Sequence, residues 1–363
     1  MSMGLDNVVA AETRLSSVDG ANGVLVIKGY ALDQIAGHKP FEEVARLLFT
    51  GLFDDLPDAG AFAARLGRAR EEAFALVQRI DDGILALPPM DGMRALIARI
   101  HDGEDIDTAL RLLAAPAVLL PAILRRRRGL SPLPPRPGQG HAADMLHMLT
   151  GKMPSPEVAG ALDTYLVTVA DHGLNASTFA ARVVASTWSG LTSSVLAGLA
   201  ALKGPLHGGA PGPIIAMLDG IGRPDNAEAW IEAALARGDR LMGFGHRIYK
   251  VRDPRADALK AAVRRMSEGS NVLPGRLMLA EAVEAAALRI LQAHKPDRPL
   301  DVNVEFYTAL LLEALGFPPD AFTAVFATGR TAGWLAHARE QRLTGRLIRP
   351  QSAYVGPEPA EAA

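Results

Sequence analysis

The longest apolar stretches of this chain are shorter than a lipid bilayer is thick. Residues 113–124 are almost wholly apolar and residues 191–202 are mostly apolar, yet each run is about 12 residues long, whereas a bilayer span needs roughly 20. Apolar residues make up 49% of the chain and charged residues 21%, which is typical of a globular protein with a substantial core. We therefore expect both runs to form helices buried in the interior.

Helical periodicity is the main pattern in the rest of the sequence. Four apolar residues recur at i, i+4, i+7 and i+11, on one face of a helix: Leu279, Val283, Ala286 and Ile290. Only residues 23–27 form a convincing strand-like stretch. Breaks rich in Pro and Gly at 131–140 and 208–213 predict an exposed loop and a candidate hinge. A mostly α-helical fold follows, and 363 residues suffice for one large or two ordinary domains.

Charge and cysteine content exclude several kinds of partner and site. The formal net charge of −2 gives no general attraction to nucleic acid or to an anionic membrane. The absence of cysteine excludes disulfides, thiolate metal ligands and cysteine nucleophiles, and it fits a reducing cytosol. Acidic residues Asp6 and Glu12 lie early in the chain and no apolar leader segment is present, so we expect a cytoplasmic location.

Three histidines lie in sequence contexts that favour ligand binding. His172 lies in ADHGLNAST, His207 in GPLHGGA and His246 in GFGHRIYK. Glycine beside an imidazole lets the backbone approach a ligand closely and leaves the ring uncrowded. Any one of the three taken alone is more often a capping or core histidine, so the interpretation depends on their acting together.

Signatures of several common enzyme classes are absent from the sequence. No HExxH and no carboxylate–histidine ligand spacing is present, so we expect no metal site. A serine-hydrolase elbow and a phosphate-binding P-loop are also missing. The stretch 243–245 (GFG) is only part of a dinucleotide fingerprint and no βαβ pattern surrounds it.

Arginines in apolar or proline-fixed surroundings indicate an anion site. Arg255 follows a proline, Arg330 lies in the small-residue stretch ATGRTAGW, and Arg349 precedes a proline near the C-terminus. A planar guanidinium binds a carboxylate through two hydrogen bonds, so these arginines and the histidines predict a cage for a small dianion. The run 125–128 (RRRR) ends an apolar helix, where cations offset the helix dipole; a grip on a cofactor phosphate is the alternative.

Five strings, in this order, resemble the citrate synthase family, which includes 2-methylcitrate synthases. They are ADHGLNAST (170–178), GPLHGGA (204–210), GFGHRIYKVRDPRA (243–256), NVEFYTALLLEALGFP (303–318) and FATGRTAGWLAHARE (326–340). The resemblance extends to both ends of the chain, through residues 4–20 and 349–356. It therefore covers essentially the whole sequence.

The resemblance implies a fold and a reaction. The fold would be an all-α, two-domain homodimer, with a large domain at 1–207 and 311–363 and a small domain at 208–310. The reaction would be a Claisen-type condensation of acetyl-CoA, or propionyl-CoA, with oxaloacetate, and then thioester hydrolysis to citrate or 2-methylcitrate and CoA. No cofactor beyond these substrates is implied. The alternatives are a non-catalytic paralogue that binds dicarboxylate or CoA, and a citryl-CoA lyase.

The resemblance also assigns roles residue by residue. The catalytic residues would be His207, which donates to the thioester carbonyl, His246, which polarises the oxaloacetate ketone, and Glu305, which is the base. The residues that hold oxaloacetate would be His172, His246, Arg255, Arg330 and Arg349, the last reaching in from the partner subunit. The residues along CoA would be Leu241, Met242, Gly243, Phe244, Gly245, Lys250 and Asn303.

Two positions depart from the pattern of the family. Pro211 and Gly212 stand where most members have Asn-Glu, and Glu305 stands where the family's usual base is aspartate. Glutamate has a reference pKa only about 0.4 units higher, so the difference is mainly one methylene of reach. Asn303 is also a good helix N-cap, which would place Glu305 in the first turn, where the helix dipole favours an anion.

Overall fold

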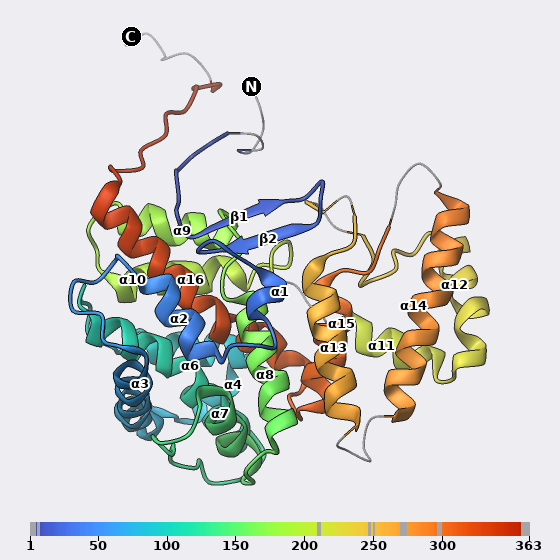
Figure 1. Cartoon of the computed structure of the whole chain (residues 1–363), viewed down its shortest axis with the longest axis horizontal. Coiled ribbons are helices and arrows are strands. Elements are labelled where there is room, and N and C mark those ends of the chain that lie inside the picture. Colours follow the sequence, from blue (N-terminus) through green and yellow to red (C-terminus); the bar gives the residue numbers. More distant parts are fainter. Residues whose placement is uncertain are drawn as a thin grey trace, which may run out of the picture.

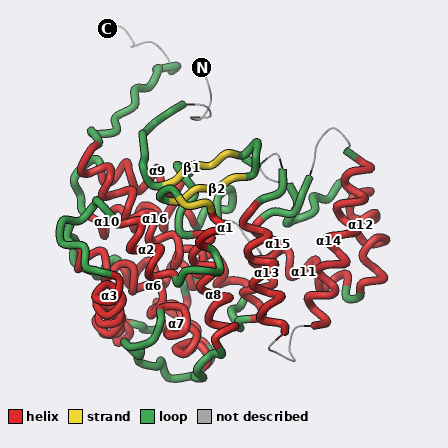
Figure 2. The backbone as a smooth tube through the Cα atoms, viewed as in Figure 1, coloured by secondary structure: helices red, strands yellow, loops and turns green. Residues whose placement is uncertain are grey.

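The computed structural model describes residues 5, 8–208, 212–245, 248–249, 251–268, 274–295 and 300–356. Within these ranges nearly all regular structure is helical, and strands form one small sheet near the N-terminus (Figures 1 and 2). The predicted all-α fold is confirmed. The helices form a larger and a smaller group that lie side by side (Figure 1).

The N-terminal sheet is antiparallel and three-stranded. Its strands are β1 (Ser16–Asp19), β2 (Val24–Ile27) and β3 (Tyr30–Ala31), in the order β1-β2-β3. The strand predicted at 23–27 is confirmed as β2, whose alternate side chains Leu25 and Ile27 are buried. β1 pairs with β2 as a hairpin, but no side chain of β1 is fully buried, so its sequence gave no strand signal.

The larger group is built from the N-terminal part of the chain together with the C-terminal helix (Figure 1). Its helices are α1 (Leu32–Ile35), α2 (Phe41–Phe49), α3 (Ala59–Phe74), α4 (Asp82–Ala86), α5 (Pro89–Ile97), α6 (Ile106–Arg127), α7 (His141–Thr150), α8 (Pro156–Val169), α9 (Ala176–Ala185), α10 (Leu191–Leu202) and α16 (Phe322–Thr344), with 3-10 turns at Ala75–Arg79 and Pro319–Ala321. Helix α16 packs against α6, α8, α9 and α10, so it runs through the middle of this group.

The smaller group contains the helices between α10 and α16. They are α11 (Gly212–Ile221), α12 (Ala227–Ala236), α13 (Pro254–Glu268), α14 (Pro274–His294) and α15 (Val304–Ala314), with a 3-10 turn at Pro224–Asn226. The helical face predicted in α14 is confirmed, because its four spaced apolar residues are all buried. Helix α13 packs against both α15 and α8, so it joins the two groups.

The apolar run 113–124 lies inside α6, a helix of 22 residues that is longer than the run alone suggested. By length and composition α6 could cross a membrane, but most of its apolar stretch is buried inside the protein, as in the core helix of a globular fold. Burial of both apolar runs is thus confirmed, since 191–202 forms α10 with a mostly buried face. The arginines at the end of α6 bond to carbonyls and, through Arg127, to Asp320 at 3.0 Å.

Helix α16 crosses α8 at a glycine. A Cβ on Gly329 would lie 2.6 Å from Val169 Cγ2 and 2.8 Å from the carbonyl oxygen of Leu166, both in α8. Contacts this short require the helices to move apart, because neither the backbone nor a buried valine can give way easily. The close approach places Arg330, the next residue, against the end of α8.

We expect Gly329→Ala to lower the free energy of unfolding by about 1–3 kcal/mol, as overpacking in a well-packed core does. Gly160→Ala is the matched control, because Gly160 lies on α8 with nothing within 4 Å of its would-be Cβ. The control should be neutral or stabilise by up to about 1 kcal/mol, because alanine is the better helix former. Urea unfolding of both variants measures the difference, and equal midpoints would contradict this packing.

Candidate active site

The N-terminus of α15 is held by hydrogen bonds to the loop before α13. The Asn303 side-chain oxygen accepts from the N–H of Glu305 at 3.0 Å, so the predicted N-cap and the first-turn position of Glu305 are confirmed. The N–H of Asn303 donates to Gly243 at 2.9 Å, and its Nδ2 donates to the Gly245 carbonyl at 2.8 Å. The N–H of Gly245 donates in turn to Asp301 at 2.7 Å. These bonds fix Glu305 relative to residues 241–245.

Glu305 and His207 line the same cavity, which has a volume of about 180 Å³. The cavity wall is formed by Pro205, Leu206, His207, Arg240, Leu241, Met242, Gly243, Phe244, Asn303 and Glu305. Gly243 has a φ of +87°, and a Cβ there would lie 2.9 Å from the ring of Phe306, so only glycine fits. The structure thus brings most of the residues predicted along CoA together with two of the predicted catalytic side chains.

His207 is a neutral imidazole with a defined tautomer. The N–H of Ser177 donates to His207 Nε2 at 3.3 Å, and Ser177 Oγ lies 2.8 Å from the same nitrogen. A backbone N–H can only donate, so Nε2 is the acceptor and the ring proton is assigned to Nδ1. Burial, aided by the charge of Arg330, lowers the pKa of His207 to about 4. At neutral pH the ring therefore offers one N–H donor without a positive charge.

Glu305 is a partly buried carboxyl group next to the Asp253–Arg255 ion pair. Burial raises its pKa above the ordinary glutamate value, and Asp253 adds to this, while Arg255 opposes it. A carboxylate whose pKa is moved toward neutral pH is a stronger base, and general bases act best when their pKa lies near the working pH.

Arg255 is part of a buried ion pair beside Glu305. Its Nε and Nη2 donate to the two oxygens of Asp253 at 3.0 and 2.9 Å. Asp253 Oδ2 also accepts from the N–H of Val304 at 3.2 Å, at the first turn of α15. The pair therefore links the start of α13 to the start of α15. Its two charges act on Glu305 in opposite directions.

Arg330 is a buried cation on α16. Its Nε donates to the carbonyl of Val169 at 2.6 Å, and its guanidinium lies over the ring of Phe326, 4.8 Å from the centroid. Burial lowers its pKa to about 10; Asp171 opposes this and Arg255 adds to it. Since the charged form is disfavoured, an anion bound beside Arg330 would be stabilising.

His172 lies on the loop between α8 and α9 and is buried. Its Nε2 lies 3.0 Å from the hydroxyl of Tyr249, and the two rings meet edge to face. Burial raises the pKa of Tyr249 to about 12, so the hydroxyl stays protonated. The guanidinium of Arg255 lies 5.5 Å from the Tyr249 ring centroid, which brings His172 and Arg255 to the same aromatic side chain.

A second, smaller cavity of about 30 Å³ lies on the other side of Glu305. Its wall is formed by Tyr165, Val169, Gly208, Arg255, Val304, Glu305, Thr308, Phe322, Thr323 and Phe326. Glu305 therefore separates an open, partly polar cavity from a small space lined by aromatic rings.

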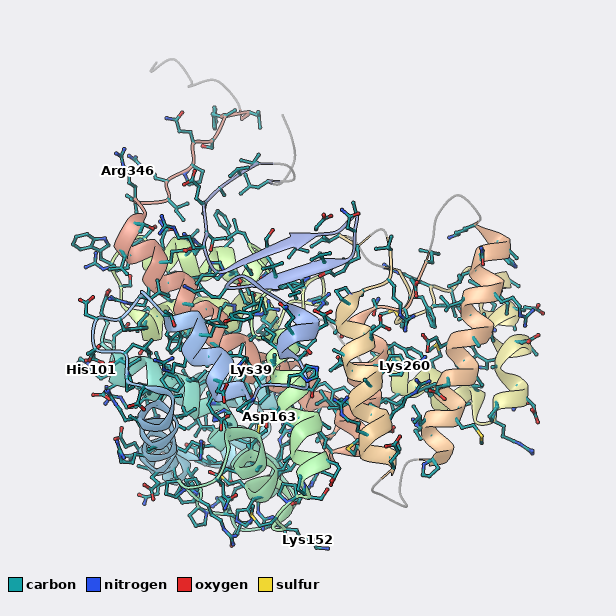
Figure 3. All side chains as sticks on the ribbon, viewed as in Figure 1. Lys39, His101, Lys152, Asp163, Lys260 and Arg346 are labelled. Atoms are coloured by element: carbon teal, nitrogen blue, oxygen red, sulfur yellow. The ribbon has the colours of Figure 1, made fainter. Side chains whose placement is uncertain are left out.

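Some predicted site residues are not placed at these cavities. His246 and Lys250 lie outside the described residues. Arg349 is exposed on the extended segment after α16, the segment that also carries Arg346 (Figure 3). Within one chain the structure therefore does not bring Arg349 to the cluster. Among the described residues, no three His, Cys, Asp or Glu side chains are grouped so that they could hold a metal ion.

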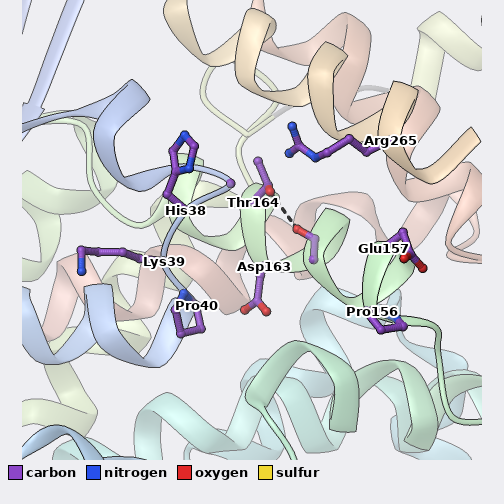
Figure 4. A pocket seen from close by; sticks show the side chains of 10 residues that line it. His38, Lys39, Pro40, Pro156, Glu157, Asp163, Thr164 and Arg265 are labelled. Atoms are coloured by element: carbon purple, nitrogen blue, oxygen red, sulfur yellow. Dashed lines mark hydrogen bonds between the residues drawn. The ribbon is translucent and has the colours of Figure 1, made fainter. Parts of the chain in front are cut away.

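Another cavity, of about 370 Å³, lies between α8 and α13 (Figure 4). Asp163 of α8 faces it, and burial together with the charge of Glu42 raises the pKa of Asp163 to about 7. Lys39 and Arg265 are the cations in its wall. None of the residues predicted to bind oxaloacetate or CoA lines this cavity.

Several residues that shape the site were not singled out from the sequence. Ser177 fixes the His207 tautomer, and Trp334 Nε1 donates to Ser177 Oγ at 3.1 Å. Asp253 pairs with Arg255, and Tyr249 contacts His172. All four residues lie inside the quoted family strings. Their contacts could not be predicted from the strings, because most of the partners are distant in sequence and the Asp253–Arg255 contact depends on the directions of the two side chains.

The site combines a neutral imidazole and a carboxylate on one cavity with buried arginines beside it. An enzyme that transfers protons on an anionic substrate needs these groups. Residues 4–351 match the family described as "Citrate synthase, C-terminal domain". The chain belongs to the citrate synthase family and is an enzyme of the citrate synthase type.

Three relatives show how far the similarity extends. The chain is 38% identical to the 2-methylcitrate synthase of Mycobacterium tuberculosis over 371 residues, 98% of this chain and 90% of that one. It is 36% identical to citrate synthase 2 of Bacillus subtilis over 367 residues, 98% of this chain and 96% of that one. The third is the structure of Thermoplasma acidophilum citrate synthase in a ternary complex with carboxymethyl coenzyme A and oxaloacetate. It superposes on this chain with a TM-score of 0.81 and is 29% identical to it, and the match covers 98% of this chain and 96% of that one.

We expect His207 to remain neutral until the pH falls to about 4, because protonation places a charge in a buried site beside Arg330. Long-range ¹H–¹⁵N NMR of ¹⁵N-histidine protein should show the Nδ1–H tautomer at pH 6 to 7, with His207→Asn identifying the resonance. Ser177→Ala keeps the backbone N–H that donates to Nε2, so it should keep this tautomer. Titration of His207 near pH 6.5, or a proton on Nε2, would contradict the assignment.

Proposed function

We propose that the protein condenses an acyl-CoA with oxaloacetate and then hydrolyses the thioester, giving citrate or 2-methylcitrate and free CoA. The observation that carries this proposal is that His207 and Glu305 line one cavity with residues 241–244. Two further observations support it: the relatives are named citrate synthase and 2-methylcitrate synthase, and one of them binds oxaloacetate and a CoA analogue.

Glu305 removes a proton from the carbon next to the thioester carbonyl. That proton is very weakly acidic, so the enolate oxygen must be stabilised as it forms. His207 donates its Nδ1–H to this oxygen, and a neutral donor fixed in a site with little water stabilises the developing charge well. The enolate carbon then attacks the oxaloacetate ketone, and water cleaves the resulting thioester.

Oxaloacetate is held by His172, Arg255 and Arg330 on one chain. The lowered pKa of Arg330 supports this assignment, because a bound carboxylate would offset the cost of burying the cation. By the family resemblance, His246 polarises the ketone. Residues 241–245, Asn303 and Lys250 lie along CoA.

The acyl chain extends past Glu305 toward the cavity of about 30 Å³. One methylene changes binding by only about 1–3 kcal/mol in an apolar pocket, so acetyl-CoA and propionyl-CoA are both substrates to be assayed. The large domain comprises 1–207 and 311–363 and the small domain comprises 208–310, with the second boundary inside α15. The enzyme works in the cytoplasm as a homodimer. No resident cofactor takes part.

Glu305→Gln should lower kcat by about 10²–10⁴-fold, because a general base contributes that much, and it should leave oxaloacetate affinity nearly unchanged. The assay follows CoA release from acetyl-CoA or propionyl-CoA plus oxaloacetate, with oxaloacetate binding measured by calorimetry. Glu232→Gln, on the exposed side of α12, is the matched control for loss of one carboxylate. Glu305→Asp tests whether the site is built around the longer side chain.

Three results would contradict the proposal in different ways, and a fourth would show whether the site is built for glutamate. Full turnover by Glu305→Gln would remove Glu305 as the base. A wild-type protein that binds oxaloacetate but releases no CoA would be a binding paralogue. Conversion of citryl-CoA to acetyl-CoA and oxaloacetate, without citrate, would identify a lyase. A higher rate for Glu305→Asp would mean that the site is not tuned for glutamate.

The position of Arg349 predicts complementation between subunits. By the family resemblance, Arg349 completes the partner's site in a two-fold dimer, and its position on an exposed, extended segment supports this. Arg349→Ala and Glu305→Gln should each be inactive alone. Half of the randomly mixed dimers are heterodimers with one complete site each, so refolding them together should restore roughly a quarter of wild-type activity. No recovery in a mixture shown by native mass spectrometry to contain heterodimers would mean that Arg349 serves its own chain.

A further inference from the structure

The first residue of β1 touches both sides of His172. Ser16 Oγ donates to Asp171 Oδ2 at 2.6 Å and accepts from the N–H of Gly173 at 2.8 Å. Asp171 is fully buried, and its carboxylate is also met by His337 Nε2 at 3.2 Å. The Ser16 hydroxyl therefore fixes the backbone on which His172 is carried.

The tip of the same hairpin rests on the segment that carries Tyr249. A Cβ on Gly20 would lie 2.3 Å from the carbonyl oxygen of Ile248, and one on Gly23 would lie 2.8 Å from Val251 Cγ2. In Figure 1 the hairpin extends from the larger group of helices toward the loops beside α13. One hairpin thus touches the loop of His172 at its base and the segment of Tyr249 at its tip.

We propose that the β1–β2 hairpin is a clamp that sets the spacing of the oxaloacetate site. Ser16 positions the loop of His172, and Gly20 lets the tip lie against the segment of Tyr249, whose hydroxyl meets His172 Nε2 at 3.0 Å. Neither residue lines the cavities beside Glu305, so both are positioning residues. The identity of the ligand as oxaloacetate rests on the proposed function; the clamp itself rests on these contacts.

The clamp matters because the side chains proposed to hold the anion come from both the larger and the smaller group of helices. His172 belongs to the loop after α8, whereas Tyr249 and Arg255 lie next to and at the start of α13. A ligand between them loses contacts on one side when the spacing changes, and a misplacement of about 1 Å can cost 10²-fold in rate. Contact by the hairpin with both sides limits such a change.

Gly20→Ala tests the tip of the clamp. The added methyl meets a backbone carbonyl and must separate the hairpin from the Tyr249 segment, yet the φ of Gly20 is ordinary, so no backbone strain confuses the result. Gly138→Ala is the matched control, because Gly138 also has an ordinary φ and has nothing within 4 Å of its would-be Cβ. Ser16→Ala tests the base of the clamp, with Ser16→Thr as the conservative variant that keeps the hydroxyl.

Gly20→Ala and Ser16→Ala should raise the KM for oxaloacetate about ten-fold or more, given the sensitivity of rate to placement. The KM for acetyl-CoA should stay as in Gly138→Ala, and Ser16→Thr should restore most of the lost affinity for oxaloacetate. Equal rises in both KM values, or no recovery with threonine, would mean a general structural role and would overturn the proposal.

Amide hydrogen exchange tests the clamp without turnover. Ser16→Ala should speed exchange in the peptide that contains Gly173, and Gly20→Ala should speed exchange in the peptide that contains Tyr249. If the wild-type protein neither binds nor converts oxaloacetate, the proposed function fails, but these exchange rates still decide whether the hairpin holds both loops. Exchange rates in both peptides that match those of Gly138→Ala would overturn the clamp.

Discussion

The arrangement of the site depends on the hydrogen-bonded start of α15. Asn303 caps this helix and at the same time bonds to Gly243 and Gly245, while Asp253 accepts from Val304 and holds Arg255. The start of α15 therefore holds two other segments in place, residues 243–245 and the stretch at Asp253. A carboxylate in the first turn of such a helix has little freedom, and general-base catalysis requires a base that is already in place when the substrate binds.

Burial sets the charge state of the groups around this helix. It raises the pKa of Glu305, lowers that of His207 to about 4 and lowers that of Arg330 to about 10. The three shifts have one cause, since each disfavours the charged form of its group. Together they give a stronger base, an uncharged hydrogen-bond donor and a cation that gains from a bound anion. These are the requirements for forming an enolate beside a dicarboxylate.

The sequence predicted what depends on local pattern. The helical face of α14, the burial of 113–124 and the cap at Asn303 follow from spacing and residue type, and the structure confirms them. The contacts between distant segments were not predictable in this way. Ser16 meets Asp171 across 155 positions, and Ser177 meets His207 across 30, and neither contact leaves a periodic signal. The length of α6 was underestimated because its ends are more polar than its middle.

The central claim is that Glu305 removes the proton from the acyl-CoA, and isotope exchange tests it apart from the condensation. Malate has a hydroxyl where oxaloacetate has a ketone, so it can occupy the dicarboxylate site without accepting a carbon. Acetyl-CoA incubated with the enzyme and malate in D₂O should gain deuterium in its methyl group without release of CoA, and Glu305→Gln should abolish this gain. Deuterium incorporation by Glu305→Gln at the wild-type rate would contradict the account.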